Sequence, residues 1–153
     1  MNTNLLEIPR LPVLGWDSFT GERAAQLPSI LNLPNLRYTT SGRAAIALAL
    51  TVLNVRSGDK VLVPTYHCPT MIAPIVRAGA TPVFFPVDAL GAPDLTFLDA
   101  MTPRYPRALL AVHYFGLPQH FSALRAWCDR RDVAFIEDCA HAFFGISDAH
   151  PVG

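Results

Sequence analysis

An aspartate that follows an apolar run is the first residue of this sequence that could do chemistry. Asp138 and its neighbour Glu137 interrupt the segment Val133-Ala-Phe-Ile-Glu-Asp-Cys-Ala-His141, which is otherwise apolar around a single histidine. An isolated buried carboxylate costs several kcal/mol or takes up a proton, so Asp138 needs water or a cation beside it. Asp138 is therefore a solvated residue at a strand end, a metal ligand, or the counter-ion of a bound cation.

The second candidate is the tetrapeptide Thr40-Ser41-Gly42-Arg43, which precedes a strongly helix-forming run. Free N–H groups and the positive end of a helix dipole favour an anion such as phosphate at this place. Gly42 would let the backbone approach that anion closely. Ser and Thr also cap ordinary helices, so a plain N-cap remains the alternative. The spacing matches neither the GxGxxG fingerprint nor a P-loop.

A metal site is the third possibility, because several histidines and cysteines could converge near Asp138. The candidate ligands lack HxH, HExxH and CxxC spacing, so we expect no zinc site. These candidates are His67, Cys68, His113, Asp138, Cys139 and His141.

Alternating strands and helices would bring these residues together. Short apolar runs bounded by Pro, Gly or polar residues predict strands at 36–39, 60–63, 82–85, 108–112 and 133–136. Helix-forming stretches predict helices at 43–54, 69–78, 95–101 and 121–131. This order predicts an α/β fold with a mainly parallel sheet and helices on both faces. Residues 1–35, rich in proline and turn formers, predict an extended arm with room for one short helix near 21–27.

The carboxyl ends of the predicted strands carry most of the candidate residues. Ligands of open α/β sheets bind outside these ends, so the side chains that follow each strand should share one site. The residues concerned are Thr40 to Arg43, Tyr66, His67, Cys68, His113, Asp138 and His141.

Composition favours a small-molecule ligand. Twelve basic and twelve acidic side chains give zero net charge without a basic stripe, so we expect neither nucleic acid nor an anionic membrane as partner. The N-terminus lacks a basic, apolar signal pattern, and no run is long enough to span a membrane. Three cysteines without CxxC spacing argue against a disulfide framework, and we expect a reducing cytoplasm.

Pyridoxal phosphate needs both candidate features at once. Its phosphate would bind the helix N-terminus at Ser41 to Arg43, and its pyridinium nitrogen would pair with Asp138. A charge-assisted hydrogen bond to that nitrogen would keep the Asp138 carboxylate ionised. Glu137 should point to the other face of the sheet, because side chains alternate along a strand.

Four segments of the chain, in order, resemble successive motifs of the DegT/DnrJ/EryC1/StrS family of aminotransferases, which act largely on nucleotide-linked keto-sugars. These segments are SGRAAIALAL, GDKVLVPTYHCPTMIAPIVRAGATPVFFPVD, AVHYFGLP and FIEDCAHAFFG, and the resemblance covers about residues 36–145. It implies that residues 36–153 form part of the large domain of a fold-type-I, aspartate-aminotransferase-like transferase. It further implies a sugar substrate, an amino-acid amino donor and a homodimer.

The resemblance also implies roles for individual residues. Asp138 would pair with the pyridine nitrogen, His141 would lie near the ring hydroxyl, and Gly42 and Arg43 would lie at the phosphate. Arg43 replaces the usual Thr or Ala and could add a cation to the phosphate site. Cys68 stands where the family usually stacks an aromatic ring on the cofactor, which leaves Tyr66 and His67 as candidates for stacking.

Lysine is the residue that does not fit. The family binds the cofactor aldehyde as a Schiff base to a lysine, whereas Lys60 is the single lysine here. Lys60 begins its predicted strand and so lies roughly 13 Å from the Asp138 end of the sheet. In the family the lysine comes from later residues, and two later strands separate the first strand from the strand that ends near Asp138.

We therefore expect this sequence to be the N-terminal, cofactor-binding part of an aminotransferase and to be inactive alone. Two alternatives remain. One is a non-catalytic homologue that binds a phosphate ligand or a partner, and the other is a dehydratase of the same fold in which the lysine is replaced.

Overall fold

The computed structural model describes Trp16 and residues 30–32, 34–101, 106–117, 119–142, 146–147 and 150–151. The predicted N-terminal arm, with its possible helix near 21–27, lies almost entirely outside these residues. In the described part of this arm, Ile30–Asn32 forms a single 3₁₀ turn, η1.

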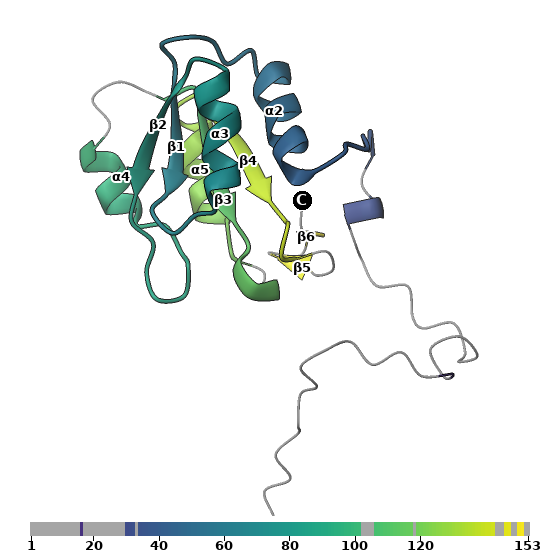
Figure 1. Ribbon diagram of the computed structural model, residues 1–153. Coiled ribbons are helices and arrows are strands. Elements are labelled where there is room, and N and C mark those ends of the chain that lie inside the picture. The colour runs from purple at the N-terminus through teal and green to yellow at the C-terminus, as the bar shows by residue number, and fades with distance from the viewer. Residues whose placement is uncertain are drawn as a thin grey trace, which may run out of the picture.

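A four-stranded parallel sheet forms the centre of the molecule (Figure 1). Its strands are β1 (Lys60–Pro64), β2 (Thr81–Phe85), β3 (Ala108–Val112) and β4 (Ala134–Asp138), in the order β2-β1-β3-β4. The register pairs Lys60 with Thr81 at one end and Val112 with Asp138 at the other. All carboxyl ends therefore meet at one edge, and the four later strands of the prediction are confirmed to within two residues.

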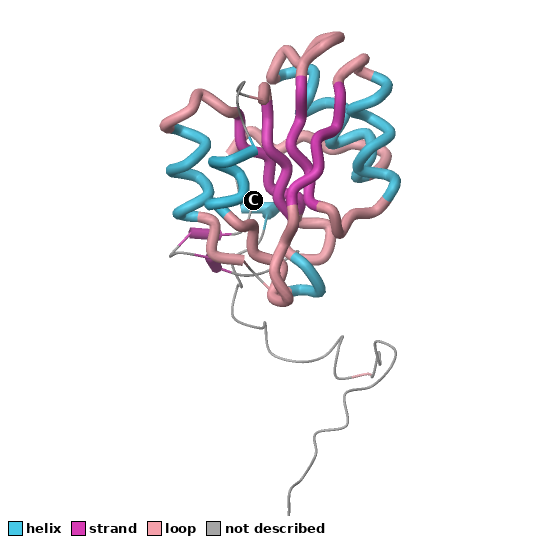
Figure 2. The backbone as a smooth tube through the Cα atoms, turned by 90° about the vertical axis from the view of Figure 1, so that its left-hand side faces the viewer, coloured by secondary structure: helices cyan, strands magenta, loops and turns pink. Residues whose placement is uncertain are grey.

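Helices cover both faces of the sheet (Figure 2). The first face carries α2 (Gly42–Val52) and α3 (Pro69–Arg77), and the second carries α4 (Leu95–Met101) and α5 (Ser122–Asp129). Local signals explain where the helices begin: Asp94 accepts hydrogen bonds from the first turn of α4, and proline opens α3. The predicted α/β class is confirmed. The remaining elements are the 3₁₀ turn η2 (Tyr114–Gly116) and the antiparallel pair β5 (Ile146–Ser147) and β6 (His150–Pro151).

The predicted strand at residues 36–39 is wrong. These residues precede α2 without pairing to the sheet, and the hydroxyl of Thr39 donates to the backbone oxygen of Ser41. A strand exists only where a neighbour supplies hydrogen-bond partners, and propensity alone does not provide them. Among the described residues, β4 is the last strand on that side of the sheet, so 36–39 has no such neighbour.

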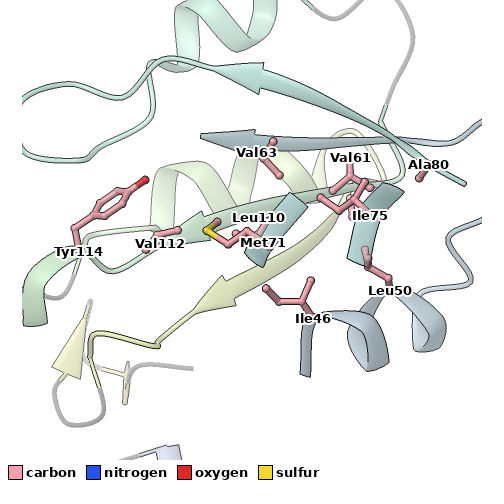
Figure 3. Close-up of a cluster of buried hydrophobic side chains, with 11 residues drawn as sticks. Ile46, Leu50, Val61, Val63, Met71, Ile75, Ala80, Leu110, Val112 and Tyr114 are labelled. Carbon is pink, nitrogen blue, oxygen red and sulfur yellow. The ribbon is translucent and has the colours of Figure 1, made fainter. Parts of the chain in front are cut away.

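Side chains of each strand alternate between two cores. Val61, Val63, Leu110 and Val112 pack under α2 and α3 in the core shown in Figure 3, whereas Leu62 packs with α4 and α5. The same alternation on β4 puts Ile136 with the first core and Phe135 with the second. By that parity, Asp138 belongs to the α2 and α3 face, and Glu137 belongs to the opposite face.

In the part of the chain that the structure describes, every helix is too short or too polar to cross a lipid bilayer.

Candidate functional site

A pocket of about 560 Å³ lies at the carboxyl end of the sheet, between the first turns of α2 and α3. It brings together all seven residues that the sequence proposes for cofactor binding, together with Tyr66. Residues from four separate segments line it: Ser41, Gly42, Arg43, Ile46, Tyr66, His67, Cys68, Thr70, Met71, Val112, Tyr114, Phe115, Asp138, Ala140 and His141. The convergence predicted from the strand ends is therefore present for these residues, but it is wrong for Thr40 and His113, which do not line the pocket.

The N-terminus of α2 offers two backbone donors to this pocket. The hydroxyl of Ser41 accepts a hydrogen bond from the amide of Ala44 at 3.2 Å, so Ser41 is an N-cap. This cap leaves the amides of Gly42 and Arg43 without a partner among the described residues. A Cβ added to Gly42 would meet nothing within 4 Å, so there is open space beside these amides. That space and those donors suit a phosphate group.

Arg43 adds a positive charge to the same corner. No carboxylate pairs with its guanidinium within the described ranges. The pKa of the exposed Cys68 thiol is lowered, first by the hydroxyl of Thr70, which donates to the sulfur at 3.1 Å, and to a smaller extent by the charge of Arg43. Arg43 is thus close enough to act on the pocket electrostatically and remains available to an anion.

Asp138 presents one carboxylate oxygen to the pocket. Its Oδ1 accepts from the amide of Ala140 at 2.9 Å, while Oδ2 has no hydrogen-bond partner in the described part of the chain. The backbone oxygen of Asp138 accepts from the amide of His113 at 3.1 Å, which fixes the end of β4 against β3. Asp138 is therefore a positioned acceptor for a cationic N–H group.

His141 faces an aromatic residue that sequence reasoning did not assign to the site. The amide of Phe115 donates to Nδ1 of His141 at 3.4 Å, and the two rings stack with centroids 6.0 Å apart. Phe115 is 70% exposed and has a left-handed backbone with φ of 55°. Tyr114 and Phe115 come just after the end of β3, next to His113. This position at a strand end, which they share with the other candidates, was the signal available in the sequence.

Tyr114 is the second residue that the sequence analysis missed. In Figure 3 it lies past the carboxyl end of β3. Its hydroxyl donates to the backbone oxygen of Tyr66 at 2.6 Å, and burial raises its pKa to about 12. Tyr114 therefore stays protonated and fastens the segment that carries Tyr66, His67 and Cys68.

The two stacking candidates differ in their surroundings. His67 donates from Nδ1 to the backbone oxygens of Pro64 and Thr65, at 3.0 and 2.9 Å, and its ring stacks on Phe84 with centroids 5.0 Å apart. Tyr66 is 58% exposed and lies 5.3 Å, centroid to centroid, from the ring of Tyr114. The ring of His67 is thus stacked face to face on Phe84, whereas the contacts of Tyr66 with Tyr114 and with Phe115, at 6.1 Å, are tilted.

His113 lies outside the pocket, on the opposite face of the sheet with Glu137 and Cys139. Their ligand atoms lie within 4.8 Å of one another. However, Nδ1 of His113 accepts from the amide of Gln119 at 2.8 Å, so the proton of the neutral ring is on Nε2, which faces Glu137. A metal ligand needs a lone pair on Nε2 and usually a donor at Nδ1, and this ring has the reverse arrangement. The cluster therefore does not suit a metal, and the expectation of a zinc-free protein remains a prediction.

Lys60 lies at the other end of the sheet, as predicted. It is exposed and lines a separate cavity of about 720 Å³ at the amino ends of the strands. The remaining lining residues are Gly58, Asp59, Pro106, Arg107, Asp129, Arg130, Arg131 and Asp132. Among the described residues no lysine lines the pocket that contains Asp138.

Residues 35–153 match the model of one protein family, described as the DegT/DnrJ/EryC1/StrS aminotransferase family. The chain is 28% identical over 144 residues to GDP-perosamine synthase of Vibrio cholerae, covering 91% of this chain and 39% of that protein. It is 36% identical over 115 residues to UDP-N-acetyl-3-dehydro-alpha-D-glucosamine 3-aminotransferase of Acidithiobacillus ferrooxidans, covering 74% of this chain and 31% of the relative.

The fold is also similar to that of 3-amino-5-hydroxybenzoic acid synthase. The TM-score is 0.66 at 32% identity, and the match covers 73% of this chain and 29% of the other. The chain thus spans less than two fifths of the length of these relatives.

Proposed function

The chain belongs to the DegT/DnrJ/EryC1/StrS aminotransferase family, and we propose that it forms the cofactor-binding part of a pyridoxal-phosphate-dependent aminotransferase. We place its substrate among the nucleotide-linked keto-sugars and its amino donor among the amino acids. The names of two relatives, a GDP-perosamine synthase and an aminotransferase of a UDP-linked sugar, support that substrate class.

The observation that carries this proposal is the joining of two unlike binding features in one pocket. The amides at the start of α2 and Oδ2 of Asp138 have no partner among the described residues; the amides, with the charge of Arg43, suit a phosphate, and the oxygen suits a ring N–H. A plain N-cap explains only the contact between Ser41 and Ala44, and leaves the amides of Gly42 and Arg43 without a role. A molecule that carries both a phosphate and a protonated pyridine would satisfy both features.

When bound, pyridoxal phosphate supplies an electron sink for negative charge that develops on the substrate carbon. In this proposal Asp138 keeps the ring nitrogen protonated through Oδ2, while the hydrogen bond from Ala140 holds the carboxylate in place. Gly42 and Arg43 anchor the phosphate. Tyr66 and Phe115, which are exposed in the pocket, cover the ring, and His141 approaches its hydroxyl.

The proposed reaction also needs a lysine that moves a proton at the substrate carbon. Lys60 is excluded by its place at the amino end of the sheet. We therefore propose that this lysine is contributed by residues outside the 153 of this sequence, and that the natural gene product completes the site.

We further propose that the protein is a homodimer in the cytoplasm. An apolar groove between α3 and β2, lined in part by Ile72, Val76 and Phe84, supports contact with a second copy. All three cysteines are free thiols, which fits a reducing compartment. Light scattering of the purified protein measures the first point, and a monomeric mass would contradict it.

The proposed function is tested on the purified natural gene product, that is, the protein as the gene encodes it. It should bind pyridoxal phosphate with an absorption band near the visible edge, and transfer the amino group of an amino acid to a nucleotide-linked keto-sugar. Cofactor binding without turnover would favour the non-catalytic alternative, and loss of a sugar hydroxyl without amino transfer would favour the dehydratase. Absence of cofactor binding would contradict the proposal as a whole.

A further inference from the structure

We propose that His113 is a positioning residue of the pocket, which holds the turn carrying Tyr114 and Phe115 against the cofactor. This role rests on the pocket binding the cofactor as proposed above. His113 acts from the opposite face of the sheet and touches neither the pocket nor its ligand.

Burial singles this histidine out. Its side chain is 1% exposed, and among the described residues it is the only polar or charged residue that is buried to this degree. Its ring packs on Phe121 with centroids 4.7 Å apart. A buried imidazole is stable only when its nitrogens are hydrogen-bonded, so its partners define what it does.

The partners of the ring fix its tautomer. Nδ1 accepts from the backbone amide of Gln119 at 2.8 Å, and therefore carries a lone pair. Nε2 then bears the proton and faces Oε2 of Glu137 at the longer distance of 3.4 Å. The short contact is thus the one that ties Gln119 back to His113 at the end of β3. Glu137 lies on β4 and the contact with it closes no loop.

The segment held in this way contains both aromatic residues that the sequence did not predict for the pocket. Phe115 and Gly116 have left-handed backbones, with φ of 55° and 79°. A non-glycine residue in this region costs of order 1 kcal/mol and persists only where its surroundings hold it. The bond between His113 and Gln119 is such a restraint, because it joins the two ends of the turn.

Two further contacts hold the side chain of Tyr114 in place. A Cβ added to Gly91 would lie 2.5 Å from Cδ2 of Tyr114, so the loop after β2 packs directly on the ring. On another side, the hydroxyl of Tyr114 holds the backbone of Tyr66. A change in the turn would therefore move the segment that carries Tyr66 and Cys68, while α2 and its phosphate-binding amides would stay in place.

Two amide variants separate the two nitrogens of the ring, because each reproduces the position of one of them. Asn in place of His113 puts an oxygen where Nδ1 lies and keeps an acceptor for Gln119. Gln in place of His113 puts its amide where Nε2 lies and keeps the contact with Glu137 alone. Neither variant keeps the imidazole ring that packs on Phe121, and each reproduces a different ring nitrogen, so the comparison of the two tests the hydrogen bond to Gln119.

The natural gene product and its two variants are titrated with pyridoxamine phosphate, followed by its fluorescence, and with inorganic phosphate as competitor. We expect His113→Asn to retain both affinities within about threefold, and His113→Gln to bind pyridoxamine phosphate about tenfold more weakly, the usual effect of one lost hydrogen bond. Phosphate affinity should stay unchanged in both variants. A purely structural defect would weaken both ligands together.

Equal affinities of the two variants for pyridoxamine phosphate, or a weaker His113→Asn, would overturn the role of His113. Failure of the unmodified protein to bind pyridoxamine phosphate would instead overturn the proposed function. If either variant does not fold, ¹⁵N NMR of histidine-labelled unmodified protein decides the matter. A proton on Nε2 and a lone pair on Nδ1 are expected, and a proton on Nδ1 would refute the role.

Discussion

The sheet has a cavity at each end, and the two cavities differ in what their polar groups already bind. At the amino end, the guanidinium of Arg107 donates to the backbone oxygen of Leu53 at 2.9 and 2.7 Å, and the carboxylate of Asp59 accepts from the amide of Arg56 at 2.8 Å. At the carboxyl end, the amides of Gly42 and Arg43 have no partner in the described part of the chain. Arg107 and Asp59 of the larger cavity are therefore bound within the chain, whereas these two amides are available to a ligand.

The direction of the chain explains this difference. In a parallel sheet the helices begin at the carboxyl edge, where their free N–H groups collect, and they end at the amino edge, where their free carbonyls collect. Arg107 binds the carbonyl of Leu53, directly after α2 ends, and so completes the helix.

The largest expected effect is a difference in transamination rate between variants on the two faces of β4. Asp138→Asn should lower the rate of transamination in the natural gene product by about 100-fold or more, because an amide cannot hold the ring nitrogen protonated. Glu137→Gln, one residue away on the other face, should leave the rate nearly unchanged. Steady-state kinetics measure both variants, and equal losses would show that Asp138 acts only through the fold.

A pair of glycine variants compares the two ends directly. Gly42→Ala fills open space at an ordinary φ, so it should leave thermal stability unchanged but weaken pyridoxamine phosphate binding about tenfold by blocking close approach. Gly58→Ala, at φ of 87° in the amino-end cavity, should lower the free energy of unfolding by about 1 kcal/mol without affecting binding. Thermal melts and titrations should show these opposite outcomes. Unchanged binding in Gly42→Ala would remove the helix N-terminus from the site.

A smaller difference, of a few-fold in labelling rate, is expected between the cysteine of the pocket and the two others. The lowered pKa of Cys68 predicts that its thiolate forms at lower pH than that of Cys128 or Cys139, whose pKa values burial raises to about 11 and about 12. Iodoacetamide should therefore label Cys68 first near neutral pH. Thr70→Val removes the main cause of the lowered pKa and should move the pH profile of labelling upward.

Pyridoxamine phosphate should slow this labelling, since Cys68 lines the pocket. If the pH profile of labelling is the same in Thr70→Val as in the unmodified protein, then Thr70 does not control the pKa of the Cys68 thiol. A labelling rate of Cys68 that pyridoxamine phosphate does not change would place Cys68 outside the ligand-binding site.

We expect Lys60 to take no part in cofactor binding or in turnover. Borohydride treatment of the 153-residue chain with a low concentration of pyridoxal phosphate should give no stoichiometric label at Lys60, because the residue lies at the amino end of the sheet. Lys60→Arg gives the background and should retain full turnover in the natural gene product. Stoichiometric labelling at Lys60 together with loss of turnover in Lys60→Arg would reverse the assignment of the two ends.

The sequence was informative where local pattern and chain direction suffice. Apolar runs bounded by breakers located β1 to β4, and strand alternation correctly separated Asp138 from Glu137. Because parallel strands share one carboxyl edge, most of the residues after them could be assigned to one pocket before any contact was known, although Thr40 and His113 do not line it.

Two features depended on contacts that the sequence does not reveal. Residues 36–39 have strand-like composition, yet pairing requires a neighbouring strand that the described residues do not provide. Tyr114 and Phe115 line the pocket beside His113, which accepts a hydrogen bond from the amide of Gln119, and no pattern of residue types predicts a bond to a backbone amide. The tautomer of His113 was equally inaccessible, although it decides against a metal.

The protonation state of the bound cofactor ring tests the central claim most directly. Pyridoxamine phosphate labelled with ¹⁵N in its ring is bound to the natural gene product and to Asp138→Asn, and the nitrogen signal is followed by NMR above the pH at which the free ring loses its proton. The structure predicts a protonated nitrogen in the unmodified protein and an unprotonated one in Asp138→Asn. An unprotonated nitrogen in the unmodified protein, or a protonated one in the variant, would contradict the assignment of the carboxyl-end pocket as the cofactor site.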